Sequence, residues 1–182
     1  MAQALRATLL LAAFTAILPG LALAEAPLFS TDGYRITLYR SPTPAQVDGA
    51  RTVDTAQLQT LLTRPGKPLL IDVYRRQWLQ GRFIEDEPHA NLPGSLWLPN
   101  TGDGALTDQW QAYFASHLQH ASAGRHDTPM VFYCRSDCWL SWNAARRAAA
   151  LGYSEVYWYR DGLDAWQAAG LPVTPAQPAP LP

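Results

Sequence analysis

Two cysteines stand four positions apart in the segment VFYCRSDCWLSWNAARRAAALGY, and the chain has no others. Cys134 ends an apolar run typical of a strand, and Cys138 comes just before a run with helical spacing. Cysteines at this separation on a tight loop can meet the Cα distance of a disulfide, about 4.4–6.8 Å. The pair is therefore a structural staple, a reversible dithiol, a metal site, or a nucleophile with a resolving neighbour, and the spacing alone does not choose among them.

The loop around these cysteines is a candidate binding site for negative charge. A loop between a strand and a helix can turn backbone N–H groups inward, and the helix N-terminus adds a partial positive charge. A cysteine at such a place has a lowered pKa, and the same pocket would hold a persulfide or an oxyanion. We expect Arg135 to add positive charge and Asp137 to oppose it. The expected binding loop is completed by Ser136 and by Trp139, whose ring either lies over the pocket or closes the core.

The N-terminal segment indicates where these thiols reside. Arg6 precedes the uncharged, apolar stretch ATLLLAAFTAILPGLALA, which ends in an Ala-x-Ala pattern. This is typical of a signal peptide over residues 1–24 with cleavage before Glu25, and the alternative is a retained membrane anchor. Nothing later is apolar for long enough to span a bilayer. We therefore expect a periplasmic protein in an oxidising compartment, where neighbouring thiols tend to pair.

Charge and composition exclude several classes of function. The chain has 14 basic and 15 acidic residues, and removal of Arg6 with the leader would leave 13 basic residues and a net charge of −2. That balance gives no reason to expect nucleic acid or an anionic membrane as a partner. Two cysteines are too few for a disulfide framework or for a four-ligand structural zinc site, so we predict no metal centre on this ground.

Short apolar runs alternate with helical patterns along most of the chain. Residues 25–50 are rich in turn formers and hold one alternating stretch, YRITLYR, which predicts an extended arm or an edge strand. We predict strands in PLLIDVY, SLWLP, PMVFYC and EVYWY, and helices in TVDTAQLQTLL, TDQWQAYFASHL, LSWNAARRAAALG and DGLDAWQAAG. In the first helix, Asp54 or Thr55 is the predicted N-cap. Such alternation predicts an α/β fold with a parallel sheet covered on both faces.

The predicted topology gives Cys134 a functional position. Ligands of parallel sheets bind beyond the carboxyl ends of the strands, and Cys134 lies at such an end. Asp72 ends the strand run LLID, and we expect its carboxylate to cap the following turn and support the site. The four histidines precede the cysteines, and we interpret them as satisfied surface residues: His89, His117, His120 and His126. The Pro/Ala-rich tail, residues 175–182, is expected to be extended.

Together these features resemble a rhodanese-like domain from about Arg51 to Val173. The resemblance lies in PLLIDVY, NLPGSLWLP, MVFYC and AARRAAALGYSEVYWYRDGLDAWQAAGLPV. It implies a three-layer fold, with a central parallel sheet flanked by helices, over residues 51–174. It also implies a catalytic Cys134 that carries sulfur as a persulfide. The leader, the Cys-x-x-x-Cys-Trp block and SWNAA resemble a subgroup, the exported CXXCW-motif proteins associated with catabolism dependent on pyrroloquinoline quinone (PQQ).

Departures from the family pattern bear on the chemistry. The loop has Asp137, Cys138 and Trp139 where family members commonly have a glycine and an arginine, and Asn91 stands where the family often has a histidine. An acidic residue and a second thiol are poor neighbours for thiosulfate. We therefore expect weak thiosulfate:cyanide sulfurtransfer.

Three functions remain as hypotheses. In the first, Cys134 attacks an electrophilic sulfur and Cys138 resolves the adduct, in service of a periplasmic redox partner or quinoprotein dehydrogenase. In the second, the chain is a copper or redox-cofactor binding protein, such as a haem-related chaperone. Soft thiolate ligands suit Cu(I), although no histidine follows Cys138. In the third, a locked disulfide holds a non-catalytic loop that presents Trp139 to a partner.

Overall fold

The computed structural model describes residues 26–85 and 87–181, so the predicted signal peptide lies outside the described residues. Five parallel strands form the central sheet in the order β1-β8-β7-β2-β6. Their bounds are β1 Arg51–Val53, β8 Val156–Tyr159, β7 Met130–Tyr133, β2 Leu69–Asp72 and β6 Leu96–Trp97. The predicted α/β class with a central parallel sheet is confirmed.

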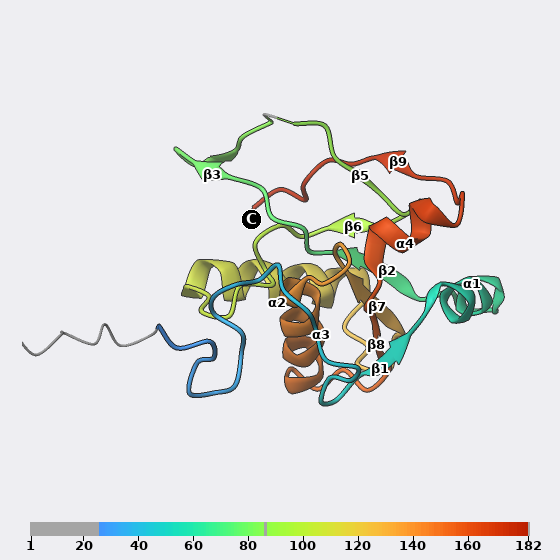
Figure 1. The fold of residues 1–182 in the computed structure, drawn as a ribbon, viewed down its shortest axis with the longest axis horizontal. Coiled ribbons are helices and arrows are strands. Elements are labelled where there is room, and N and C mark those ends of the chain that lie inside the picture. The colour runs from blue at the N-terminus through green and yellow to red at the C-terminus, as the bar shows by residue number, and fades with distance from the viewer. Residues whose placement is uncertain (1–25, 86, 182) are drawn as a thin grey trace, which may run out of the picture.

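Helices cover both faces of the sheet (Figure 1). One face packs against α1 (Thr55–Thr63) and α4 (Gly162–Ala168), and the other against α2 (Asp108–Ala121) and α3 (Trp139–Ala150). Strand β7 shows why both faces of the sheet must be covered by helices, because all four of its residues are buried. Val131 and Tyr133 belong to the α1/α4 core, whereas Met130 and Phe132 belong to the α2/α3 core. Alternating side chains of one apolar strand thus fill two separate layers.

A local hydrogen-bonding pattern sets the start of α1, directly after β1. The Asp54 carboxylate accepts from the Gln57 N–H, and the Gln57 side chain accepts from the Asp54 N–H, which completes a capping box. The helix predicted over TVDTAQLQTLL therefore begins only at Thr55, and the residues before Asp54 form β1 beside β8. Asp54 is thus the N-cap, one of the two residues predicted for that role, and its extended backbone separates β1 from the helix.

Short antiparallel pairs flank the β6 edge of the sheet (Figure 1). Strands β3 (Trp78–Leu79) and β4 (Arg82–Phe83) form a hairpin, and β5 (Ala90–Asn91) pairs with β9 (Thr174–Pro175). The extended tail continues along this edge, where the Ala176 N–H donates to the His89 carbonyl and the Ala179 N–H to the Trp97 carbonyl. The Pro/Ala-rich segment is thus part of the packed structure.

The arm that precedes β1 crosses the face of α3. The stretch YRITLYR joins no strand of the central sheet and forms only isolated bridges, at Arg35 and Arg40. Asn143 of α3 binds the backbone of this stretch at one residue, Arg35. It accepts from the Arg35 N–H at 2.9 Å and donates to the Arg35 carbonyl at 2.8 Å.

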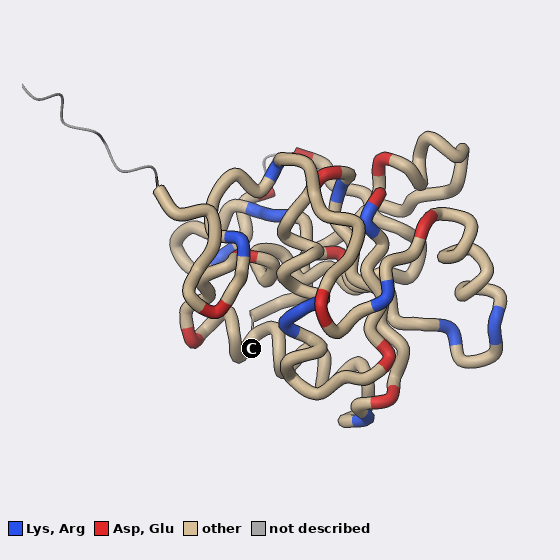
Figure 2. Tube along the Cα trace, turned by 60° about the horizontal axis from the view of Figure 1, so that its bottom comes forward, with Lys and Arg blue, Asp and Glu red and all other residues tan. Residues whose placement is uncertain are grey.

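Charged positions of both signs are scattered along the trace (Figure 2). Across the described residues, no helix combines the length and the apolar character needed to cross a membrane.

Candidate active site

The site lies at the carboxyl edge of the sheet. Tyr133, the last residue of β7, stands in register with Asp72 of β2 and Tyr159 of β8. Cys134 is the next residue, so the strand delivers it directly beyond this edge. The loop then runs to Cys138, which is the N-cap residue of α3. The predicted position of the two cysteines, between a strand and a helix, is confirmed. Helix α3 begins at Trp139, one residue before the predicted run LSWNAARRAAALG.

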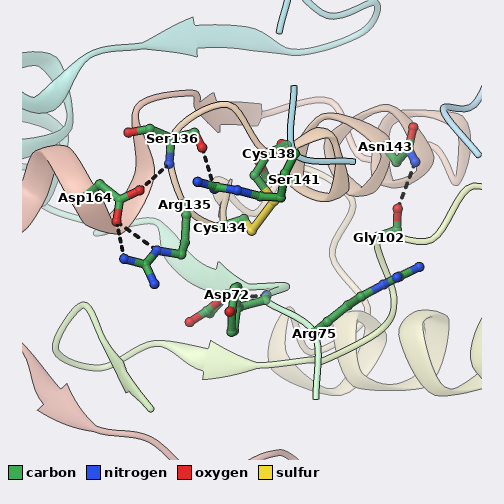
Figure 3. The surroundings of a disulfide bond; sticks show 12 residues. Asp72, Arg75, Gly102, Cys134, Arg135, Ser136, Cys138, Ser141, Asn143 and Asp164 are labelled. Atoms are coloured by element: carbon green, nitrogen blue, oxygen red, sulfur yellow. Dashed lines mark hydrogen bonds and ion pairs between the residues drawn. A yellow bond between two sulfur atoms is a disulfide. The ribbon is translucent and has the colours of Figure 1, made fainter. Parts of the chain in front are cut away.

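Cys134 and Cys138 form a disulfide with a Cα–Cα distance of 6.2 Å (Figure 3). This separation lies within the range of protein disulfides. Both residues are buried, with 0% and 1% of their surface exposed. The bond closes a loop whose two ends are fixed by different elements, a strand and a helix N-terminus.

Helix α4 holds one side of the loop. The Asp164 carboxylate accepts from the Ser136 N–H at 3.0 Å and from Arg135 Nε at 2.8 Å (Figure 3). The hydrogen bond with Asp164 raises the pKa of Arg135. The Cys134 carbonyl accepts from the Leu163 N–H at 2.9 Å, and Ser136 Oγ donates to the Asp161 carbonyl at 2.6 Å.

The arm holds the opposite side. Arg40 Nη1 donates to the Ser136 carbonyl at 2.6 Å, and an isolated antiparallel bridge joins Arg40 to Cys138. Asp137 has a left-handed backbone, with φ of 49°, and its carboxylate accepts from the Thr43 N–H at 3.3 Å. The Asp137 carboxylate is thus held against the arm.

Two backbone N–H groups of the loop region donate to acceptors within the protein. The Ser136 N–H is bonded to Asp164, and the Trp139 N–H donates to the Tyr39 carbonyl at 2.9 Å. Neither donor is available to a bound anion in this arrangement. The reason is tertiary, because α4 and the arm supply acceptors that the sequence of the loop does not reveal.

Trp139 closes the core beneath the arm, which is one of the two roles predicted for it. Its side chain is buried, and its indole N–H donates to Ser41 Oγ at 3.0 Å. The ring packs edge-on against Phe29 and Trp142, and the Arg35 guanidinium lies 4.9 Å from its centroid.

A buried acid–histidine pair lies at the same edge and was missed by sequence reasoning. Asp72 Oδ1 accepts from the Tyr74 N–H at 2.8 Å, so its predicted turn-capping role is confirmed. Its Oδ2 lies 2.7 Å from His89 Nε2, and the two side chains are only 1% and 9% exposed. The interpretation of His89 as a surface histidine is wrong. The sequence did hold a signal for such a pair. A carboxylate at the end of a buried strand requires a hydrogen-bonding or charged partner.

Burial governs the acid–base properties of this pair. Desolvation raises the pKa of Asp72 above its ordinary value, and the bond to His89 offsets part of this rise. Burial and the nearby Asp72 charge also raise the pKa of Tyr133 well above its ordinary value. Tyr133 donates to Ser95 Oγ at 2.7 Å and accepts from the Leu92 N–H at 3.0 Å.

A cavity of about 290 Å³ opens beside the disulfide. Its wall includes Tyr39 and Arg40 of the arm, Tyr74 and Arg75 after β2, and Arg135 and Cys138 of the loop. Within the described part of the chain, no group of three or more His, Cys, Asp or Glu residues is placed to hold a metal ion.

The fold and the site define an α/β domain with a cysteine presented at the carboxyl end of a central parallel strand. The family model described as the rhodanese-like domain matches residues 54–169, which is more than half of the chain. The chain therefore belongs to the rhodanese-like domain family, and the predicted resemblance is confirmed at that level. General sulfur-transfer chemistry is the function that this membership supports.

Solved structures of this kind resemble the chain at low sequence identity. A protein from Anabaena sp. is 18% identical, with 67% of this chain and 79% of that chain covered and a TM-score of 0.46. The polysulfide-sulfur transferase homodimer of Wolinella succinogenes is 15% identical, with coverage of 69% and 79% and a TM-score of 0.44. A human single-domain sulfurtransferase is 22% identical, with coverage of 65% and 96% and a TM-score of 0.41. No curated protein matches the chain.

Proposed function

We propose that this rhodanese-like protein reduces sulfane sulfur by thiol–disulfide chemistry at Cys134 and Cys138. The observation that supports it most directly is the bond between the strand-end cysteine of the family and a second cysteine of the same loop. A persulfide formed on Cys134 would have a resolving thiol within bonding reach. Simple transfer of the sulfur to an external acceptor would not need that second thiol.

The reaction balances without a metal or an organic cofactor. The Cys134 thiolate attacks the sulfane sulfur of a donor, the donor leaves as its reduced anion, and Cys134 carries a persulfide. The Cys138 thiolate then attacks Cys134 Sγ, forms the disulfide and expels the terminal sulfur as hydrosulfide. That sulfur has gained two electrons, and the two cysteines have lost them. Two equivalents of an external thiol reopen the disulfide.

Single-cysteine variants separate the two roles. Reduced protein and a polysulfide donor should release sulfide, and the protein should become oxidised in equal amount. Cys138→Ser should gain the mass of one sulfur atom on Cys134 and release almost no sulfide. Cys134→Ser should form no stable persulfide. Equal sulfide release by wild type and Cys138→Ser would remove the resolving role and leave simple sulfur transfer.

Ordinary thiosulfate:cyanide sulfurtransfer should be slow. Thiosulfate is a dianion, and two amides of the loop region, those of Ser136 and Trp139, donate to Asp164 and to Tyr39 and so do not bind it. We expect turnover at least about tenfold below that of single-domain rhodaneses, which corresponds to the loss of about 1.4 kcal/mol of transition-state stabilisation. A standard thiocyanate assay measures it. Fast turnover that disappears in Cys134→Ser would restore the simple family reaction.

We further propose that the protein acts in the periplasm, beside a PQQ-dependent alcohol-oxidising system. The leader, the Cys-x-x-x-Cys-Trp block and SWNAA support this proposal through their resemblance to the exported CXXCW-motif proteins. Intact-mass measurement of the exported protein should place its N-terminus at Glu25. Recovery of Met1 on exported protein would contradict cleavage, and purification of the protein without any quinoprotein dehydrogenase bound at low salt would contradict a stable complex.

A further inference from the structure

Only one of the two bonded cysteines lines the cavity beside the disulfide. The cavity has a volume of about 290 Å³, and its lining residues include Cys138 but not Cys134. Cys134 is fully buried and follows directly from β7, with its carbonyl bonded to the Leu163 N–H. Of the two bonded cysteines, Cys138 is therefore the one that the oxidised protein presents to a nucleophile in this cavity. Access is one of the factors that decide which sulfur of a disulfide is attacked.

Three arginines and no acidic residue line this cavity: Arg40, Arg75 and Arg135. Two of them are partly neutralised from outside the wall. Arg75 pairs with Asp103 at 2.6 Å, and Arg135 pairs with Asp164 at 2.7 Å. Both pairs are partly exposed, so each arginine keeps N–H donors that can turn toward a ligand.

Arg40 adds a positive charge to the cavity lining that no ion pair offsets among the described residues. Among the residues that the structure describes, no carboxylate forms an ion pair with it, and its Nη1 donates to the Ser136 carbonyl. The nearest acidic residue along the loop, Asp137, is not part of the wall and is bonded to the Thr43 N–H. Tyr39 and Tyr74 add aromatic surface, and the Arg75 guanidinium lies 4.5 Å from the Tyr39 ring centroid. The cavity thus suits a small ligand with a negative group and an apolar stem.

We propose that the disulfide is opened through this cavity by an anionic thiol, one that carries a carboxylate, with Cys138 as the attacked sulfur. The inference rests on the proposed function, for which it identifies the class of reductant. The thiolate attacks Cys138 Sγ and forms a mixed disulfide there, and Cys134 leaves as a thiolate. A second thiolate attacks the sulfur of the bound thiol, which releases a small-molecule disulfide and a Cys138 thiolate. Two electrons pass from two thiols to the protein.

The site of attack can be read directly from a tryptic digest. The peptide bond after Arg135 separates the two cysteines, so Cys134 and Cys138 fall on different tryptic peptides. Oxidised protein is mixed briefly with 3-mercaptopropionate, quenched in acid, treated with maleimide and digested. We expect the mercaptopropionate adduct on the peptide that begins at Ser136 and the maleimide on Cys134. The adduct on the peptide that ends at Arg135 would overturn the proposal.

Selectivity for charge provides a second test that does not require the intermediate to accumulate. Reduction rates are measured with anionic 3-mercaptopropionate and cationic cysteamine, each expressed per concentration of thiolate at low salt. In wild type we expect the anionic thiol to react at least fivefold faster. Arg40→Gln should lower that ratio at least twofold, and Arg40→Glu should lower it further. A wild-type ratio near one would overturn the proposal.

A matched control removes the effect of overall charge. Arg125 is exposed and lies in the turn before β7, at the opposite edge of the sheet from the cavity. Arg125→Glu changes the net charge as Arg40→Glu does, and it should leave the thiol ratio unchanged. An equal fall in both variants would show that only long-range charge is being measured and would contradict the proposed binding role. Sulfide release is scored separately, so a failure of the proposed function is distinguishable from a failure of this inference.

Discussion

Asp72 shows how a single buried carboxyl ties the active edge of the sheet together. It caps the turn after β2 through the Tyr74 N–H and bonds to His89 across 17 positions of sequence. The His89 ring is stacked on Tyr74, whose side chain also lies in the wall of the disulfide cavity. The acid–histidine pair therefore positions one wall of the site through Tyr74.

Replacement of Asp72 by asparagine should reveal its effect on stability as a function of pH. Burial raises the pKa of Asp72 from 3.8, so the folded state holds this proton more tightly than the unfolded chain does. Its stabilising contribution is complete below pH 3.8 and is lost as the pH rises toward the folded pKa. Asp72→Asn has no such loss, and its amide keeps an acceptor for Tyr74 and a donor for His89.

The free energy of unfolding of Asp72→Asn, relative to wild type, should therefore increase with pH across that window. The slope has an upper limit of about 1.4 kcal/mol per pH unit. Urea unfolding from pH 3.5 to 7 measures it, with the exposed Asp127→Asn as the control variant. A difference that stays flat or falls with pH would contradict the assignment.

The two cysteine residues should form a reversible pair rather than a staple. Cys138 is the N-cap of α3, so both sulfur atoms lie at a helix N-terminus, which stabilises thiolates and hence the reduced form. We expect a reduction potential of roughly −270 to −120 mV. Equilibration in glutathione buffers, followed by alkylation and mass analysis, measures it. A potential well below about −300 mV would make the bond a structural staple.

At the scale of elements, the active loop is held between α4 and the arm. Asp164 of α4 and Arg40 of the arm bind neighbouring groups of Ser136 from two sides. The closest approach of α4 to the loop is at Gly162. A Cβ at this position would lie 2.5 Å from the Cys134 carbonyl oxygen, and the residue has a φ of +58°. The start of α4 can therefore approach the loop only with a glycine at this position.

Gly162→Ala should be costly for two reasons, whereas Gly170→Ala carries only one of them. Both positions have a positive φ, which costs an alanine about 1–2 kcal/mol. A methyl group at Gly170 would meet no neighbouring side chain or backbone within 4 Å, whereas a methyl group at Gly162 would collide with backbone. Overpacking adds about 1–3 kcal/mol, so Gly162→Ala should lose about 2–5 kcal/mol of unfolding free energy. Equal losses in the two variants, measured by urea unfolding, would contradict the close contact.

At the scale of the whole molecule, stability comes from the two cores rather than from the disulfide. Large buried side chains fill both faces of the sheet, among them Trp158, Phe114 and Phe132 on one side and Tyr133 and Leu58 on the other. The disulfide spans a sequence separation of only 4. A loop this short loses little chain entropy when it is closed, so its removal should leave the fold intact.

The double variant Cys134→Ala/Cys138→Ala should accordingly fold and unfold cooperatively. Chain entropy predicts a loss of about 2 kcal/mol in unfolding free energy for so short a loop. Chemical denaturation followed by circular dichroism measures it, and reduced wild-type protein should show a similar loss. An unfolded double variant would show that the bond is required for folding, which would favour the locked, non-catalytic interpretation.

The sequence by itself determined the layers of this protein and the place of its cysteines. The apolar runs that form β2, β7 and β8, the capping signal at Asp54 and the strand-end position of Cys134 are local patterns. They arise from backbone periodicity and hydrogen bonding over a few residues, so each can be read without knowledge of the fold.

Only the tertiary structure decided what surrounds the cysteines. Arg40 and Ser136 are 96 positions apart, and Asp164 and Ser136 are 28 apart, yet both pairs form hydrogen bonds. The same holds for Asp72 and His89, and for the strand β1 that pairs with β8. Such contacts depend on how the arm, α4 and the sheet edge pack together, and a side chain carries no local signal of the distant group that it will meet. The acceptors of the Ser136 and Trp139 N–H groups were therefore decided by packing.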